Sequence, residues 1–181
     1  TGSKKESNFH VVDSEYRGLA ALDAVTAIVI AEGYATADTL SQALSCPVVA
    51  AFDSGNLLKV AQVLQNKYPQ KPIVIAGDDD LTQESINGKN PGKEKAMEAA
   101  QLVNGAVVLP IFAPGEQMSQ QLSDFNDLAN KSVLGIEAVK RQVGSVVEKV
   151  SQQAKQDSLL KLQVPIEPKQ QEIKQKRALV R

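Results

Sequence analysis

The sequence predicts an α/β fold: a doubly wound, Rossmann-like domain with a mainly parallel four-stranded sheet. Short apolar runs rich in β-branched residues alternate with helical patterns along the chain. The apolar runs are bounded by Gly, Asp or Pro, as is typical of strands that are buried on both faces. The length of 181 residues allows one domain with a substantial core, plus an appendage.

Each predicted element follows from its local pattern. Apolar runs predict strands at residues 27–31, 47–52, 72–77 and 105–110, and helical spacing predicts helices at 36–44, 57–66 and 93–103. Residues 81–92 and 111–123 are expected to be loops. Because right-handed crossovers place the loops that follow parallel strands at one edge of the sheet, we expect a ligand to bind at that edge.

The regions outside this alternation are interpreted separately. Residues 1–26 are expected to form an N-terminal extension, in which 9–12 resemble a short edge strand. Residues 131–163 are expected to form a C-terminal helical segment, and 164–181 a flexible basic tail or linker. An apolar stripe with spacings of three and four runs along the helical segment through Ile136, Val139, Val143, Val146 and Val150. It predicts docking on the same domain, or a contact with another chain or domain.

Composition excludes several kinds of site. A net charge of −1 excludes a globally basic nucleic-acid-binding surface, although a local basic patch stays possible. The single cysteine, Cys46, excludes an internal disulfide framework and a cysteine-cluster zinc site. The single histidine, His10, excludes a site built on two imidazoles. No apolar run approaches the roughly 18 residues of a membrane span, so we expect no membrane partner and a cytoplasmic location.

Acidic residues follow three of the four predicted strands. Glu32 follows the first strand, Asp53 the second, and Asp78 to Asp80 the third. Carboxylates that lie close together repel one another, and a hard divalent cation such as Mg²⁺ neutralises them without needing His or Cys. Residues i and i+2 of an extended segment point the same way. We therefore expect Asp78 and Asp80 to face one metal ion and Asp79 to point elsewhere.

Four motifs in order resemble the Toprim domain, which is shared by bacterial-type DNA primases, topoisomerases and some nucleases. They are Glu32-Gly33-Tyr34, Asp53-Ser54-Gly55-Asn56, Asp78-x-Asp80 and Asp124-Phe125-Asn126-Asp127-Leu128. The resemblance covers residues 27–130, which we take as a catalytic domain. It is closer to the primases of plasmids and phages, in which this domain is often fused to relaxase or helicase modules.

The resemblance implies roles for individual residues. Glu32 would be the general acid/base and a possible metal contact, and Asp78 and Asp80 would bind Mg²⁺, with Mn²⁺ as a possible substitute. Asp124 or Asp127 would complete a second metal site. One departure is Thr36, which stands where cellular primases carry an aspartate four residues after the motif glutamate. This departure puts the second metal in doubt.

Two lysines, Lys93 and Lys95, open a predicted helix beside the acidic edge and are candidate phosphate contacts. The resemblance implies that the chain makes RNA primers on single-stranded DNA from nucleoside triphosphates. It would be one domain of a larger conjugation or replication protein. We expect weak or no activity from it alone, since neither a zinc ribbon nor a strongly basic DNA-binding region is visible.

Two alternatives remain open from the sequence. One is a Toprim nuclease or DNA-nicking module that uses the same acids. The other is a degenerate Toprim fold that serves as a docking domain. The oligomeric state is left open.

Overall fold

A five-stranded sheet forms the centre of the computed structural model, which describes residues 7–15 and 17–163. The strands are β1 (His10–Val12), β2 (Ile28–Ala31), β3 (Val48–Ala50), β4 (Ile73–Ala76) and β5 (Ala106–Val108). Their order across the sheet is β1-β3-β2-β4-β5. The four strands β2 to β5 are parallel, as predicted, and β1 adds a fifth, antiparallel strand at the edge next to β3.

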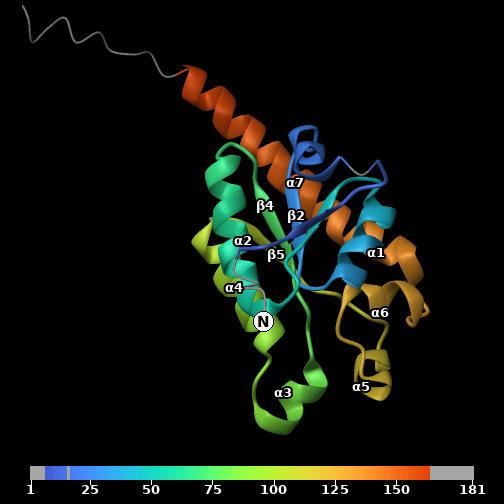
Figure 1. Cartoon of the computed structure of the whole chain (residues 1–181). Coiled ribbons are helices and arrows are strands. Elements are labelled where there is room, and N and C mark those ends of the chain that lie inside the picture. The colour runs from blue at the N-terminus through green and yellow to red at the C-terminus, as the bar shows by residue number, and fades with distance from the viewer. Residues whose placement is uncertain (1–6, 16, 164–181) are drawn as a thin grey trace, which may run out of the picture.

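Helices cover both faces of the sheet (Figure 1). One face is covered by α1 (Tyr34–Leu44), α6 (Phe125–Asn130) and α7 (Gly135–Gln163), and the other by α2 (Ser54–Lys67) and α4 (Pro91–Leu102). Successive strand residues alternate between the two cores: Val29 packs with the α1 and α7 side, and Ile30 with the α2 and α4 side. Burial on both faces explains why the strands are continuous apolar runs, and it confirms the doubly wound fold.

Three short helical segments complete the described chain: η1 (Gly18–Asp23), α3 (Leu81–Asn87) and α5 (Glu116–Gln120). The last two lie in segments that the sequence predicted as loops. In α3 the Asp80 side chain caps the first turn by accepting a hydrogen bond from the Gln83 N–H at 2.9 Å. Gly88 ends the helix in the left-handed region, with φ of 69°.

The apolar stripe of α7 docks on its own domain. Val139 and Val143 are fully buried, and Val146 and Val150 pack partly buried against the same core. The C-terminal part of α7 then extends away from the body of the domain (Figure 1). No helix in the described ranges has both the length and the apolar character needed to cross a bilayer. The predicted basic tail, residues 164–181, lies outside the described residues, as do 1–6 and 16.

Candidate active site at the carboxyl edge of the sheet

Acidic side chains from four segments meet where the parallel strands end. Ala31 is paired with Ala50 of β3 on one side and Ala76 of β4 on the other, so these strands end at the same level. The next acids along the chain are Glu32, Asp53 and Asp78, and Asp124 and Asp127 join them from α6. The sheet order thus converts acids far apart in sequence into neighbours, while α3, α5 and α6 lie around the same edge (Figure 1).

Asp78 is the least compensated of these acids. Its Oδ1 atom is buried and has no hydrogen-bond partner. Burial raises the pKa of Asp78 to about 7, and the charges of Glu32, Asp124 and Asp127 act in the same direction. A buried carboxylate in this position requires either a proton or a cation.

Two glycines bring α4 against Asp78. A Cβ atom at Gly92 would lie 3.1 Å from the Asp78 Cβ atom, and one at Gly77 would lie 2.5 Å from the Ala96 Cβ atom. The second distance is shorter than side chains tolerate, so the backbone approach between β4 and α4 requires glycine at residue 77. The first turn of α4 therefore lies directly against Asp78.

Two other acids act on Glu32. Burial raises its pKa above the ordinary value, and the charges of Asp53 and Asp124 raise it further. The Ser54 backbone N–H donates a hydrogen bond to the Glu32 carboxylate and opposes this shift. Asp53 caps α2 by accepting from the Asn56 N–H at 3.0 Å. Glu32 is therefore a carboxylate with increased proton affinity at the edge of the cluster.

Asp124 and Asp127 are fixed by local hydrogen bonds. Asp124 caps α6 by accepting from the Asp127 N–H at 2.7 Å, and its Oδ2 atom accepts from the Thr36 hydroxyl at 3.0 Å. Asp127 accepts from the Ser123 N–H at 3.0 Å and forms an ion pair with Lys131 at 2.7 Å. The contact of Thr36 with Asp124 had no signal in the sequence, where Thr36 stood out only as a missing acid.

Asp79 and Asp80 have hydrogen-bond partners, unlike the Oδ1 atom of Asp78. Asp79 Oδ1 accepts a hydrogen bond from the buried Asn90 side chain at 2.8 Å, so this carboxylate has a partner of its own. Asp80 caps α3. The carboxylates of Asp78 and Asp80 therefore have different surroundings in the absence of metal, and the prediction that both face one metal ion stays a prediction. The surroundings differ because β4 ends at Ala76 and the backbone has left the extended conformation by Asp80, to begin α3.

The two candidate lysines also differ. Lys93 lies beside the acidic edge, with its Nζ atom 3.6 Å from Asp79 Oδ1 and 3.9 Å from a Glu84 oxygen. Lys95 instead pairs with Glu98 on the exposed side of α4, at 2.6 Å. The hydrogen bond with Glu98 raises the pKa of Lys95. Of the two, Lys93 is the one that contacts acids in the segment that follows β4.

The donor chemistry of the cluster fits a hard divalent cation. All the candidate ligands are carboxylates, which Mg²⁺ and Mn²⁺ prefer, and one of them has a buried oxygen without a partner. In the described part of the chain, however, no three or more His, Cys, Asp or Glu side chains are grouped closely enough to hold a metal ion. The caps at Asp80 and Asp124 help to explain this, because their hydrogen bonds hold these side chains to α3 and α6.

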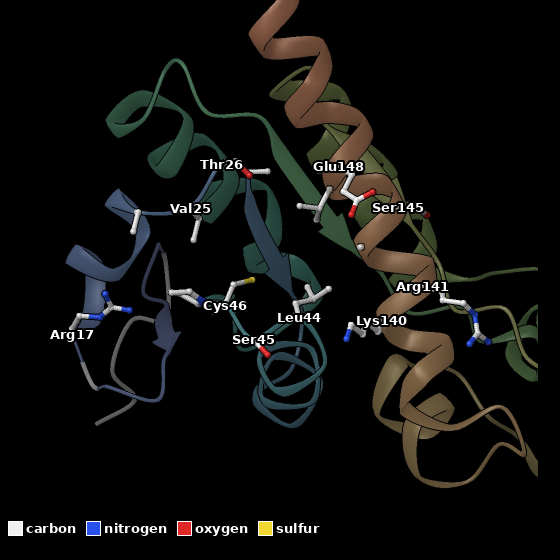
Figure 2. Close-up of a pocket in the computed structure, with 15 residues that line it drawn as sticks. Arg17, Val25, Thr26, Leu44, Ser45, Cys46, Lys140, Arg141, Ser145 and Glu148 are labelled. Atoms are coloured by element: carbon white, nitrogen blue, oxygen red, sulfur yellow. The ribbon is translucent and has the colours of Figure 1, made fainter.

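The opposite edge of the sheet is different in character. A cavity of about 830 Å³ lies between α7 and the segments that precede β2 and β3. Thr26, Cys46, Lys140 and Ser145 are among its lining residues. Lys140 points toward Leu44 and Ser45, whereas Arg141 points away from them (Figure 2). None of the predicted site residues lines this cavity.

Comparison with known proteins identifies the fold family. A model of the Toprim domain matches residues 27–133. Two Escherichia coli relatives, both named DNA primase TraC, are 39% identical to the chain over 210 and 232 aligned residues. The alignments cover 85% and 97% of this chain but 14% and 22% of the relatives, so the chain spans less than a quarter of their length. No solved structure matches. The match over more than half of the chain shows that it belongs to the Toprim family.

Proposed function

We propose that this chain is the catalytic domain of a plasmid- or phage-type DNA primase, which joins ribonucleotides into primers on single-stranded DNA with Mg²⁺. The observation that carries the proposal is the buried Asp78 oxygen without a partner, surrounded by the charges of three other carboxylates. The similarity to DNA primase TraC supports the choice of reaction. The domain would work in the cytoplasm, within a larger conjugation or replication protein.

The metal ligands would come from Asp78, Asp80, Asp124 and Asp127, with Glu32 as a possible further contact. Bound Mg²⁺ would neutralise phosphate charge and hold the reacting oxygens in place, and Mn²⁺ would be a possible substitute. Asp78 would be the central ligand because it lacks a competing hydrogen bond at Oδ1. Asp80 and Asp124 would have to exchange their cap hydrogen bonds for the metal.

Glu32 would move the proton. A general base works best when its pKa lies near the working pH, and burial and the neighbouring acids shift the pKa of Glu32 in that direction. The Ser54 N–H fixes its carboxylate beside the cluster. Glu32 would accept the proton of the attacking hydroxyl, while Lys93 would contact phosphate after giving up its ion pairs with Asp79 and Glu84. Lys95 would serve as a second phosphate contact only after leaving Glu98.

The first experiment is a Mg²⁺ titration followed by amide NMR shifts. Shift changes should cluster at Glu32, at 78–80 and at 124–127, and the Asp78→Asn/Asp80→Asn variant should abolish them. Asp157→Asn, which changes an exposed carboxylate on α7, is the matched control and should leave them unchanged. The same shifts in the double variant would exclude this edge as the metal site.

The second experiment distinguishes the reactions. The chain is incubated with Mg²⁺, single-stranded DNA and labelled nucleoside triphosphates, and both incorporation and DNA cleavage are measured. Incorporation, even if weak, supports a primase. Cleavage without incorporation identifies a nuclease. A docking domain would do neither, and its apparent mass would rise with concentration.

A further inference from the structure

Two exposed aromatic side chains lie close to Glu32 in the chain or next to an acid that acts on it: Tyr34 stands two residues after Glu32, and Phe52 directly precedes Asp53. Tyr34 is 52% exposed and Phe52 is 45% exposed. The remaining tyrosines and phenylalanines of the described chain are buried or partly buried; they are Phe9, Tyr68, Phe112 and Phe125. Exposed aromatic surface in the described residues is thus concentrated at the carboxyl edge of the sheet, beside the carboxylates.

Phe52 has an unusual backbone. Its φ angle is 74°, in the left-handed region that bulky residues rarely adopt. The residues around it are fixed: the Ala51 N–H bonds the Ala31 oxygen at 2.9 Å, and Asp53 caps α2. Glycine would satisfy this backbone without strain. A large ring in a strained and exposed position suggests a contact with a molecule outside the chain.

Tyr34 lies at the same edge, next to β1. It is the first residue of α1, two positions after Glu32. Its ring lies 5.7 Å from that of His10, at an interplanar angle of 40°. His10 is paired with Ala50 of β3, so the sheet itself supports the position of Tyr34. The two aromatic side chains therefore stand on backbone whose position is set by β2 and β3.

The charges at this edge favour a ligand that is held by stacking on aromatic rings rather than by ion pairs. Lys93 is paired with Asp79 and Glu84, and Lys131 with Asp127, so these two cations are already committed to carboxylates. Aromatic rings bind nucleobases by stacking, which does not depend on charge or on sequence. A strand held in this way could approach the acids without first competing for these lysines.

We infer that Tyr34 and Phe52 form a stacking surface for the nucleobases of a single-stranded DNA template beside the carboxylates. This inference rests on the proposed function, since it names how the template is held at that site. Phe52 would stack on one base and Tyr34 on another. Both would be positioning residues, because neither would touch the reacting atoms.

The absence of tryptophan from the chain gives a direct test. Phe52→Trp and Tyr34→Trp each introduce a single fluorophore at the proposed surface. A 12-residue oligothymidine should quench both in a saturable manner, because stacking on a base changes the indole environment. Leu159→Trp, at an exposed position of α7, is the matched control and should not be quenched. ATP with Mg²⁺ is added separately, to distinguish a template base from the base of an incoming nucleotide.

Alanine variants measure how much the rings contribute. Phe52→Ala and Tyr34→Ala should each weaken oligothymidine binding about 5- to 100-fold, the range found for single stacked bases. Phe52→Trp should preserve the affinity. Phe52→Gly should weaken binding without lowering the melting temperature, because glycine adopts the positive φ freely. That result separates a lost contact from a damaged fold.

Three results would overturn the inference: no saturable quenching at residues 34 and 52, equal quenching at residue 159, or affinity unchanged in both alanine variants. Quenching by ATP and not by oligothymidine would overturn the assignment to the template. The proposed function fails separately. Quenching without nucleotide incorporation would support the stacking surface and contradict the primase function. Asp78-dependent incorporation without quenching would support the primase function and contradict the stacking surface.

Discussion

The two edges of the sheet differ in what their side chains do. At the carboxyl edge, α2, α3, α4 and α6 begin, and each is capped by an Asp or Asn side chain. At the amino edge, a cavity is lined mainly by small and apolar residues, together with the basic side chains of Arg17, Lys140 and Arg141 and one acid, Glu148. At the carboxyl edge, mainly acidic side chains thus cap the helices that begin there. The amino edge instead contains an open cavity.

Asp78 differs from the other aspartates at the carboxyl edge. An Asp at the end of a strand usually has a structural task, because it caps the next helix. Asp53, Asp80 and Asp124 all do so. Asp78 caps nothing, and its Oδ1 atom has no partner. Asp78, which caps no helix, is therefore the best candidate for a role in chemistry.

The largest difference between the edges should be seen in catalysis. Asp78→Asn should lower nucleotide incorporation to the background of the assay, a fall of up to about 1,000-fold, because a central metal ligand would contribute several kcal/mol to the transition state. Lys140→Ala, at the amino-edge cavity, should leave incorporation within about twofold of the unchanged chain. Initial rates with labelled nucleotides check both. Equal losses in the two variants would contradict the assignment of catalysis to one edge.

The next effect is on stability and uses one glycine from each edge. Gly77→Ala should lower the free energy of unfolding by about 1–3 kcal/mol, since its Cβ atom would meet the Ala96 Cβ atom at 2.5 Å. Gly144→Ala in α7 should raise it by about 0.5–1 kcal/mol, because the added atom meets Leu44 at an ordinary 3.8 Å. Urea unfolding measures both. If both variants changed the free energy of unfolding in the same direction, the expected difference between the two glycines would be contradicted.

The pH dependence of stability should change with Asp78. Without metal, its pKa is about 7 in the folded chain and lies above the ordinary value, so the folded state binds the proton more tightly. Stability should fall as the pH rises from about 4 to about 7, by about 1–2 kcal/mol after allowing for partial solvation, and then level off. Glu32 contributes in the same direction.

Asp78→Asn should remove most of this slope. Thermal unfolding at several pH values, with and without Mg²⁺, is the measurement, and Asp157→Asn should keep the slope of the unchanged chain. A slope that survives Asp78→Asn would assign the titration to Glu32 or to another group.

The smallest expected effect concerns Thr36. Thr36→Val removes the hydroxyl that donates to Asp124 but keeps a similar volume. A hydrogen bond to a charged group contributes about 1.5–3 kcal/mol, and part of this is recovered by water. We therefore expect about 5- to 10-fold weaker Mg²⁺ binding. Thr39→Val, which loses a hydrogen bond to Asn126 instead, is the control. Unchanged Mg²⁺ affinity in Thr36→Val would separate Thr36 from the metal site.

The sequence predicted the parallel strands and long helices because their periodicity is strong and local. It did not predict α3, whose residues include none that is buried and whose start depends on one cap. The unpaired Asp78 oxygen depends on the packing of α4, and the Thr36–Asp124 bond joins residues 88 positions apart. The type and order of the acids were readable from sequence, whereas their hydrogen bonds depend on tertiary structure.

Cys46 gives the amino-edge cavity a practical use. It is the only cysteine of the chain, it is partly exposed, and it lines the cavity on the side of the sheet away from the carboxylates. Burial raises the pKa of its thiol, so a maleimide or disulfide reagent should react slowly at neutral pH and faster in alkali. The molecule therefore carries a natural attachment point for a spin label or a dye. From there, distances to an added oligonucleotide can be measured without altering an acid at the carboxyl edge.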